Sequence, residues 1–488
     1  MQAINSALRS NPNPAPHTAW KKAVGHTGVE FAPTALKTVS GRIPSGLRGS
    51  LYRNGPARLE RGGQRVRHWF DGDGAVLGVH FRENGATGVY RFVRTQSYLA
   101  DERARTLTCG SYGMVSPKPK LLSMLKPVRQ VIKNPASLSA LALPDRLLAL
   151  WDQGHPYVLD PETLETRGQD TLGVLQEHQS YAAHYKRDPH AQEIYSFGIT
   201  YGMSATLNVY RSNPTGHIER QTAIDLGCLP IVHDFIIAGT YLVFFICPVR
   251  LNPIPVITHR RSFSDCLSWQ PELGTQILIL DRQTLEVVSR SETDPWYMWH
   301  FGNGYVDTDG SIVGDMVRYE DFKTNDYLKE VGLLDIKTAA PGTLCQFRID
   351  PQSARVLETI DVLPLGGEFP VVSPTEVGEY SRYTYLSTFR PGADISRDLW
   401  GTIARFDYQT GVATIAQMGP NHYPTEPMYA PDAENPDRGW ILTVVFDGDR
   451  SSSEVWIYDA DRLDDEPVCK LALPGIIPIG YHGTWKPA

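Results

Sequence analysis

The chain has 488 residues, of which 41% are hydrophobic and 10% aromatic, so it can build a large core and is not globally disordered. Its 47 Lys and Arg against 54 Asp and Glu give a net charge of −7, so nucleic acid is not an expected partner. The 42 Gly and 36 Pro indicate many turns.

The sequence shows no targeting segment. The N-terminus has no apolar signal region, and the longest apolar run, 241–249, is much shorter than the roughly 20 residues of a membrane-spanning helix. The 6 cysteines are scattered without a CxxC pair, so neither a disulfide framework nor a zinc cluster is predicted. We therefore expect a cytoplasmic protein whose contact with a membrane, if any, is peripheral.

A β-hairpin pattern recurs along the chain: an apolar run, a short turn rich in Asp, Gly, Asn or Pro, and a second run. It occurs at 79–93, 157–167, 207–221, 277–290, 346–359, 404–416 and 455–471. Propeller blades repeat at such intervals, about 50 to 80 residues, with one hairpin in each. The repeat predicts an all-β fold, a seven-bladed β-propeller over 41–488 preceded by a leader with a helix at 1–40. An irregular β-sandwich is the alternative.

One segment breaks the β pattern. Residues 118–143 mix Lys and Arg with Leu, Met, Val and Ile and contain no acid. A basic amphipathic stretch of this kind can lie on a membrane surface or line an apolar entrance. An insertion helix packed on the propeller is the other interpretation.

Four of the histidines share a phase with the repeat. His184, His233, His300 and His482 each follow a hairpin by about 19 to 24 residues. In a propeller the innermost strand of the next blade begins there, and innermost strands surround the central axis. We therefore expect these four side chains to converge on one point.

Three acids accompany the histidines. Glu368 and Glu426 hold the same phase after two other hairpins, and Asp152 lies on an equivalent strand. A metal-bound imidazole needs an acceptor for its second ring nitrogen, which these carboxylates can supply. Four neutral nitrogens suit a divalent iron that keeps open positions for O₂ or substrate. Zinc is the competing metal, but its sites usually close at four ligands or use three and a water.

The motifs of the chain are similar to those of the carotenoid cleavage oxygenase family. The resemblance extends from about residue 41 to 485 and includes SGLRGSLYRNGPARLE, HWFDGDGAV, FVRTQSY, DRLLALWD, IVHDF, GEFPVV and HGTW. It implies a seven-bladed propeller with Fe²⁺ on its axis, held by the four histidines, with Asp152, Glu368 and Glu426 as their acceptors. We expect His184 to lack a carboxylate partner.

The resemblance also implies the chemistry. Family members use O₂ to split one C=C bond of an extended conjugated substrate into two carbonyl products, without a reductant or an organic cofactor. A dome of loops forms an apolar tunnel over the metal, and the insertions at about 96–150 and 248–270 fall where that dome would be. No obligate protein partner is expected, and 118–143 is the segment that would meet a membrane.

Two departures from the family pattern concern the site: Asp152 stands where many members have Glu, and Leu138 stands where Thr is frequent. Leu138 would make the open side of the metal drier. The favoured function is cleavage of a carotenoid or apocarotenoid to a retinal-like apocarotenal. A lignostilbene-type dioxygenase is the alternative, since Tyr98 and Lys133 fall near the residues that contact the phenol in that branch. A metal-free propeller that acts as a binding scaffold is the third possibility.

Overall fold

The computed structural model describes residues 18–115 and 132–488. All seven predicted hairpins are present as antiparallel pairs, which confirms the all-β prediction. The pairs are β6 (Asp73–Arg82) with β7 (Gly85–Phe92), β10 (Tyr157–Leu159) with β11 (Thr166–Gln169), β14 (Ala205–Ser212) with β15 (Ile218–Asp225), β20 (Thr275–Asp281) with β21 (Val287–Thr293), β24 (Thr343–Ile349) with β25 (Val356–Val371), β27 (Thr402–Asp407) with β28 (Val412–Ile415), and β32 (Ser452–Asp459) with β33 (Cys469–Ala472).

The hairpin turns are set by local chemistry. In the turn after β10 the Asp160 carboxylate accepts hydrogen bonds from the backbone N–H groups of Glu162 and Thr163. The turn after β20 repeats this contact with Asp281. Asp side chains that bond the backbone two and three residues on compete with regular structure and fix a turn. The same D-x-x-T-L sequence therefore gives the same reversal twice.

The hairpins belong to larger sheets. One sheet has the order β1 (Phe31–Ala35), β7, β6, β3 (Gly49–Arg58), β34 (Gly483–Pro487). Three four-stranded sheets follow: β11, β10, β9 (Leu147–Leu150), β8 (Ser139–Ala142); then β12 (Tyr185–Arg187), β13 (Ile194–Tyr201), β14, β15; then β16 (Ile236–Ala238), β17 (Tyr241–Ile246), β20, β21.

The remaining large sheets cover 297–472. One runs β22 (Tyr297–Val306), β23 (Ile312–Tyr319), β24, β25, β26 (Tyr383–Thr388), β27, β28. The other runs β2 (Lys37–Gly41), β33, β32, β31 (Gly439–Asp447), β29 (His422–Pro424), with β30 (Met428–Pro431) also on β31. The 16-residue β25 pairs with β24 along its first part and with β26 along its last part.

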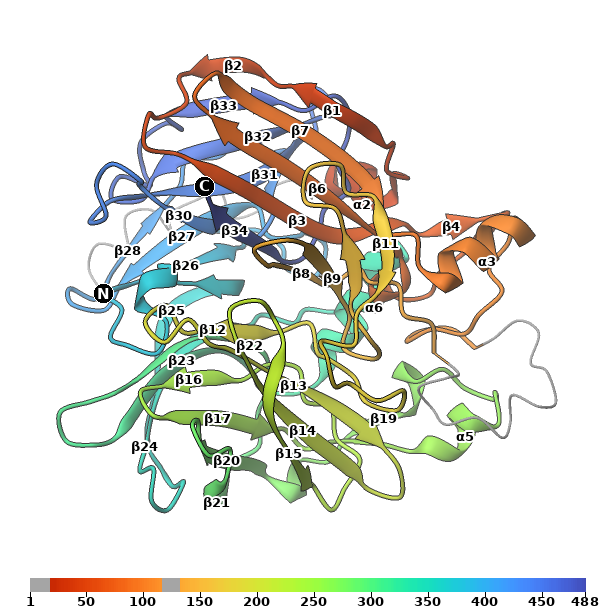
Figure 1. Ribbon diagram of the computed structural model, residues 1–488, viewed down its shortest axis with the longest axis vertical. Coiled ribbons are helices and arrows are strands. Elements are labelled where there is room, and N and C mark those ends of the chain that lie inside the picture. Colours follow the sequence, from red (N-terminus) through yellow and green to blue (C-terminus); the bar gives the residue numbers. More distant parts are fainter. Residues whose placement is uncertain (1–17, 116–131) are drawn as a thin grey trace.

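The two ends of the described chain are joined in the sheets. β34 pairs with β3, and Figure 1 shows β34 beside the orange strand β3 near the middle of the molecule. β1 pairs with β7 and β2 with β33, so residues 31–41 lie within the sheets rather than in a separate leader. The short helix α2 (Trp20–Gly25) anchors this region through the fully buried Trp20.

Four strands at the edges of their sheets matter for the site. β12, β16, β22 and β34 each stand at one end of their sheet's strand order. β16 contacts β22, and β34 contacts both β8 and β30. Residues at the start of these edge strands are therefore brought to a common region.

The predicted dome segments pack together at one end of the sheets. The 248–270 segment forms β18 (Val249–Leu251), α5 (Pro253–Ile257) and β19 (Leu267–Trp269). The backbone N–H of Ser264 donates to the Tyr112 carbonyl at 2.8 Å, and the Tyr112 hydroxyl donates to Asn325 at 2.8 Å. Asn325 belongs to α6 (Lys323–Gly332), which also contacts the short helix η1 (Trp69–Asp71). We call these packed segments, together with α6 and η1, the cover. The sequence analysis did not expect α6 and η1 to be part of it.

The basic segment 118–143 is described only from residue 132. Its last part is not a helix: residues 139–142 form the buried strand β8. Lys133 is buried and pairs with Asp73 at 3.1 Å, so it does not face a membrane surface. Among the described residues, no helix combines the length and the apolar character needed to cross a bilayer.

Candidate metal centre

The structure brings the four in-phase histidines together. His184, His233 and His482 lie just before the edge strands β12, β16 and β34, and His300 lies within β22. One ring nitrogen of each lies within 4.8 Å of the others, and the Nε2 atoms of His184 and His233 are 3.1 Å apart. The sheet-edge geometry that the repeat predicted is the reason for this convergence.

Three of the histidines are held by the three predicted acids. The Nδ1 atom of His233 lies 2.7 Å from Asp152, that of His300 lies 2.6 Å from Glu368, and that of His482 lies 2.9 Å from Glu426. Since an ionised carboxylate only accepts, each Nδ1 carries the hydrogen. The Nε2 atoms are then left with a free lone pair. Asp152 reaches His233 directly, although its side chain is one methylene shorter than Glu.

His184 differs from the other three. Its Nδ1 atom lies 3.8 Å from the carboxylate of Asp234, which is beyond hydrogen-bond distance. Asp234 is buried, pairs with Lys186 at 3.0 Å, and accepts the backbone N–H of Phe301 at 2.9 Å. The sequence analysis missed Asp234, although it directly follows His233 in the IVHDF motif.

Two further side chains behind the acids were also missed. Arg53 donates to the Glu426 carboxylate at 2.8 Å and to the Tyr481 carbonyl at 3.0 Å. The Tyr319 hydroxyl donates to Glu368 at 2.6 Å. Groups that hold an acid in turn fix the histidine it contacts, so these contacts reduce the freedom of the whole cluster. Arg53 stands in the YRNGP motif, which is the signal that the sequence offered.

The electrostatics of the cluster keep two of its imidazoles neutral, those of His184 and His300. Burial, followed by the neighbouring histidines, holds the pKa of both His184 and His300 well below the usual value. Burial also acts to lower the pKa of His233, but the Asp152 carboxylate outweighs it and the net shift is upward. Burial raises the pKa of Glu368 to about 7. A neutral imidazole is the form that binds a metal.

The donor set fits a divalent transition metal. The Nε2 atom of His300 is buried and has no hydrogen-bond partner among the described residues. Such an orphaned lone pair is costly unless a ligand uses it. Imidazole nitrogens suit first-row transition metals, and carboxylates bonded to the second nitrogen set the ring orientation. The residues that could hold the ion are His184, His233, His300 and His482.

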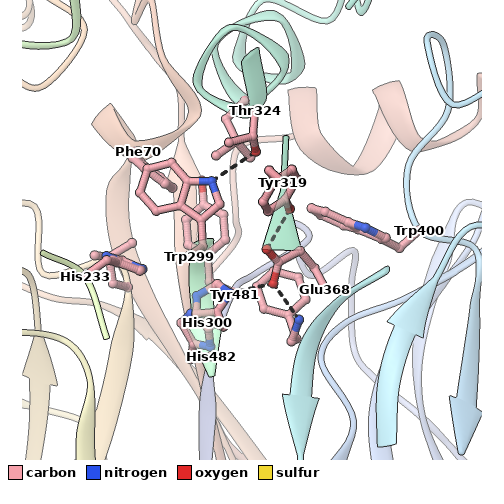
Figure 2. A pocket seen from close by; sticks show the side chains of 13 residues that line it. Phe70, His233, Trp299, His300, Tyr319, Thr324, Glu368, Trp400, Tyr481 and His482 are labelled. Atoms are coloured by element: carbon pink, nitrogen blue, oxygen red, sulfur yellow. Dashed lines mark hydrogen bonds and ion pairs between the residues drawn. The ribbon is translucent and has the colours of Figure 1, made fainter. Parts of the chain in front are cut away.

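An apolar cavity borders the cluster, and Figure 2 shows Phe70, Trp299, Tyr481 and Trp400 around it. Its volume is about 20 Å³. Trp299 is fixed by a 3.0 Å hydrogen bond from its indole nitrogen to Thr324 of α6. The cavity therefore combines an aromatic wall with an edge of histidines.

The three predicted tunnel residues do not lie in one place. Leu138 lines the cavity, whereas Tyr98 and Lys133 are not among its described lining residues. The Tyr98 hydroxyl accepts from Arg94 at 2.5 Å, and its ring lies against the guanidinium of Arg61. The Lys133 ammonium donates a hydrogen bond to the Asp73 carboxylate. Both side chains are buried, and other residues engage their polar ends.

Comparison with known proteins places this fold and this histidine cluster in a class of oxygenases. The chain belongs to the carotenoid oxygenase family, whose model, described as retinal pigment epithelial membrane protein, matches residues 26–487. This confirms the resemblance seen in the motifs. The protein is therefore an oxidoreductase rather than a non-catalytic scaffold.

Individual relatives agree with this membership. The apocarotenoid-15,15'-oxygenase of Synechocystis is 32% identical over 461 residues, which cover 92% of each chain. The resveratrol cleavage oxygenase 1 of Aspergillus fumigatus is 26% identical, over 92% of this chain and 91% of the relative. A cobalt-substituted structure of the Synechocystis apocarotenoid oxygenase superposes with a TM-score of 0.86 at 30% identity, covering 96% of this chain and 98% of the other.

Proposed function

We propose that the protein is a non-haem Fe²⁺ dioxygenase that cleaves one C=C bond of a carotenoid or apocarotenoid to two carbonyl products, one of them retinal-like. The observation that carries the proposal is the position of the buried four-histidine cluster at the edge of an aromatic cavity. The similarity to an apocarotenoid-15,15'-oxygenase supports the substrate class.

The proposed fold is a seven-bladed propeller. The sheet from β22 to β28 would supply two blades that share β25, and the other large sheets would supply one each. The blade edges β12, β16, β22 and β34 would then surround the axis. In this arrangement 41–488 is one domain, with the dome insertions at about 96–150 and 248–270.

In the proposed site the four histidines would hold iron, and the three acids keep the proton on Nδ1 of their partners. Bound iron would supply the redox chemistry by which O₂ reacts with the alkene. The reaction balances without a reductant, because a C=C bond and O₂ become two C=O groups. The protein's own contribution is to keep water out of the apolar cavity and to hold the polyene there with aromatic side chains such as Trp299 and Phe70.

Substrate entry requires movement of the cover. A cavity of about 20 Å³ holds roughly one water molecule and no conjugated chain. Leu138, Leu328 and Phe369 line it. Leu328 lies on α6, whose contacts to the 248–270 segment run through Ser264 and Asn325. Displacement of α6 with that segment would open the cavity.

The stilbene-type alternative is not favoured by the geometry, although relatives with such names exist. It needs a Tyr and a Lys at the phenol, and the Lys133 ammonium is buried against Asp73 instead. With Lys133 and Tyr98 both engaged elsewhere, a phenol in the cavity would find neither.

Delivery from a membrane is the last part of the proposal. The segment 118–143 carries Leu121, Leu122 and Leu125 among basic residues, and it lies outside the described residues up to 131. Each basic residue near an anionic surface contributes about 1 kcal/mol to binding. Replacing the three leucines by Ser should weaken binding to liposomes and leave cleavage of detergent-dissolved substrate intact. Unchanged liposome binding would place the membrane contact elsewhere.

The function is tested with the Fe²⁺-loaded protein and ¹⁸O₂. Apocarotenals, carotenes and hydroxystilbenes are offered separately and the products are identified by mass. The expected result is two carbonyl products from an apocarotenal, each with one ¹⁸O before exchange with water. Cleavage of the hydroxystilbenes alone would overturn the assignment in favour of the stilbene branch. Incorporation of a single ¹⁸O would contradict a dioxygenase.

A further inference from the structure

A second, larger cavity reaches the histidine cluster, and it has no role in the proposed cleavage reaction. Its volume is about 510 Å³, and it is lined by His184, His300 and His482. His233 borders only the apolar cavity, and His184 only this one. The cluster therefore borders two cavities, one small and one wide. We call the wide one the polar funnel, after the charged side chains that interrupt its otherwise largely apolar wall.

The polar funnel connects the cluster with the surface. Its lining begins at buried residues such as His300 and ends at the exposed residues Gln192, Thr375 and Pro487. Between them it contains charged side chains: Lys186 and Arg187 on β12, and the carboxylates of Asp234 and Glu426. The rest of the wall is largely apolar and includes Ile236, Phe301 and Val371. A passage of this size that reaches the surface and contains these charged groups has room and polar partners for water.

The contrast between the two cavities matters for an ion. A hydrated divalent cation loses much free energy when it leaves water for apolar surroundings. The apolar cavity, with Trp299, Phe70 and Leu138 in its wall, offers no replacement for that water. The polar funnel lets an ion keep water until it meets the cluster.

His184 is the histidine best placed to receive the ion. It borders the polar funnel, and among the described residues no carboxylate hydrogen-bonds its Nδ1 atom. Its ring is therefore less fixed than those of His233, His300 and His482. A ligand that can turn is suited to capture an arriving ion or to release one.

We propose that the polar funnel is the route by which the metal ion enters and leaves the centre, with His184 as the ligand that engages first. The inference rests on the proposed metal centre and adds a separate wet path for the ion. Substrate uses the apolar cavity, so the metal can be exchanged without passage through the substrate site.

The first test narrows the funnel. Val371 on β25 and Met428 on β30 are half-buried residues of its wall. Val371→Trp and Met428→Trp are made separately, with Met428→Leu as the matched control. Metal-free protein is mixed with Co²⁺ or Fe²⁺, and bound metal is measured over time after rapid desalting. Release is followed with an excess of a coloured chelator. The Trp variants should slow both rates about tenfold, because the narrowed passage strips water from the ion.

The second test compares the two cavities. Leu138→Phe fills the apolar cavity and should reduce substrate cleavage while metal uptake keeps the wild-type rate. If Leu138→Phe slows uptake and the two Trp variants do not, the ion enters by the substrate side and the proposal is wrong.

The third test uses charge. Lys186 lies in the funnel in an ion pair with Asp234, so Lys186→Met leaves the Asp234 carboxylate unpaired beside the path and should accelerate uptake of a cation by about tenfold, from Coulomb attraction at intermediate dielectric. Lys186→Arg, which keeps the charge, should behave like wild type. Passage of a neutral molecule such as O₂ through the funnel would not change in these variants. Trp variants that raise the KM for O₂ but exchange metal at the normal rate would overturn the proposal in favour of an oxygen path.

Failure of the funnel and failure of the metal centre are distinguishable. If wild-type protein binds no stoichiometric metal, the centre itself is wrong. If it binds metal and the Trp variants, folded by circular dichroism, exchange it at the wild-type rate, only the route is wrong.

Discussion

Arg53 and Glu426 form a buried ion pair directly behind the metal centre: Arg53 Nη1 lies 2.8 Å from Glu426 Oε2, with side-chain exposures of 1% and 9%. The other Glu426 oxygen, Oε1, contacts His482 at 2.9 Å. The Glu426 carboxylate thus links Arg53, on the strand β3 that pairs with β34, to the proposed ligand His482. Burial acts to raise the pKa of Glu426, but His482 and Arg53 outweigh it, and the net shift is downward.

Arg53→Met should destabilise the protein by about 3–5 kcal/mol, because it leaves the Glu426 charge buried without its partner. Chemical denaturation of the metal-free protein measures this. The double variant Arg53→Met with Glu426→Gln should recover part of the loss, because the uncompensated charge is gone. Strictly additive losses would show that the pair is not coupled.

His300→Ala should abolish stoichiometric metal binding, since His300 supplies one of four donors and its loss leaves Glu368 without the ring it orients. Metal analysis after dialysis measures the outcome. His190→Ala, at an exposed histidine outside the cluster, is the matched control and should keep full metal content. A fully occupied His300→Ala protein would remove His300 from the ligand set.

Asp152→Asn should lower metal affinity by about 10- to 100-fold, because a neutral amide is a weaker acceptor for His233 Nδ1. Competition with a chelator of known affinity gives the value. Asp152→Glu keeps the charge and should lose less. Equal affinities for all three proteins would mean that the 2.7 Å contact has no influence on the metal.

Leu138→Ala should lower the free energy of unfolding by about 2–5 kcal/mol, because Leu138 is 2% exposed and its removal enlarges a cavity. Denaturant titration measures the change. Metal content should stay at the wild-type level, since Leu138 contacts the substrate side of the cluster. Loss of metal in this variant would place Leu138 among the supports of the histidines.

Removal of the metal should lower the melting temperature. A ligand present at 100 times its Kd stabilises the folded state by about 2.7 kcal/mol. Calorimetry with and without a chelator, followed by readdition of Fe²⁺ or Co²⁺, measures the shift. Identical melting curves for the loaded and stripped wild-type protein would contradict a site that exists only in the folded chain.

The hairpins could be predicted because their causes are local. Asp160 and Asp281 fix their turns through backbone groups two and three residues away, so the D-x-x-T-L pattern contains the information. The phase of the histidines relative to those hairpins then indicated a common region. The hairpin repeat can be recognised from the sequence alone, because it does not depend on contacts between distant residues.

The cover and the supporting network could not be predicted in this way. Lys133 reads as a surface residue of a basic segment, yet it is buried because Asp73, 60 residues earlier, is placed beside it by β6. Arg53 and Glu426 are 373 residues apart. Such pairs depend on how sheets that are distant in the sequence pack together. The sequence around one residue of a pair does not indicate the other. The three acids beside the histidines were expected from the sequence, but the support that Arg53 gives to Glu426 needed the structure.

The pairing of β34 with β3 sets an order in time for biosynthesis. His482 precedes β34, whereas His184, His233 and His300 are translated roughly 180 to 300 residues earlier. During translation the nascent chain therefore holds three donors and an unpaired β3 edge until His482 leaves the ribosome. Chains interrupted before that point would keep an exposed β3 edge, to which another strand can pair, and would therefore tend to aggregate. They would also lack His482 and with it one of the four donors of the metal centre.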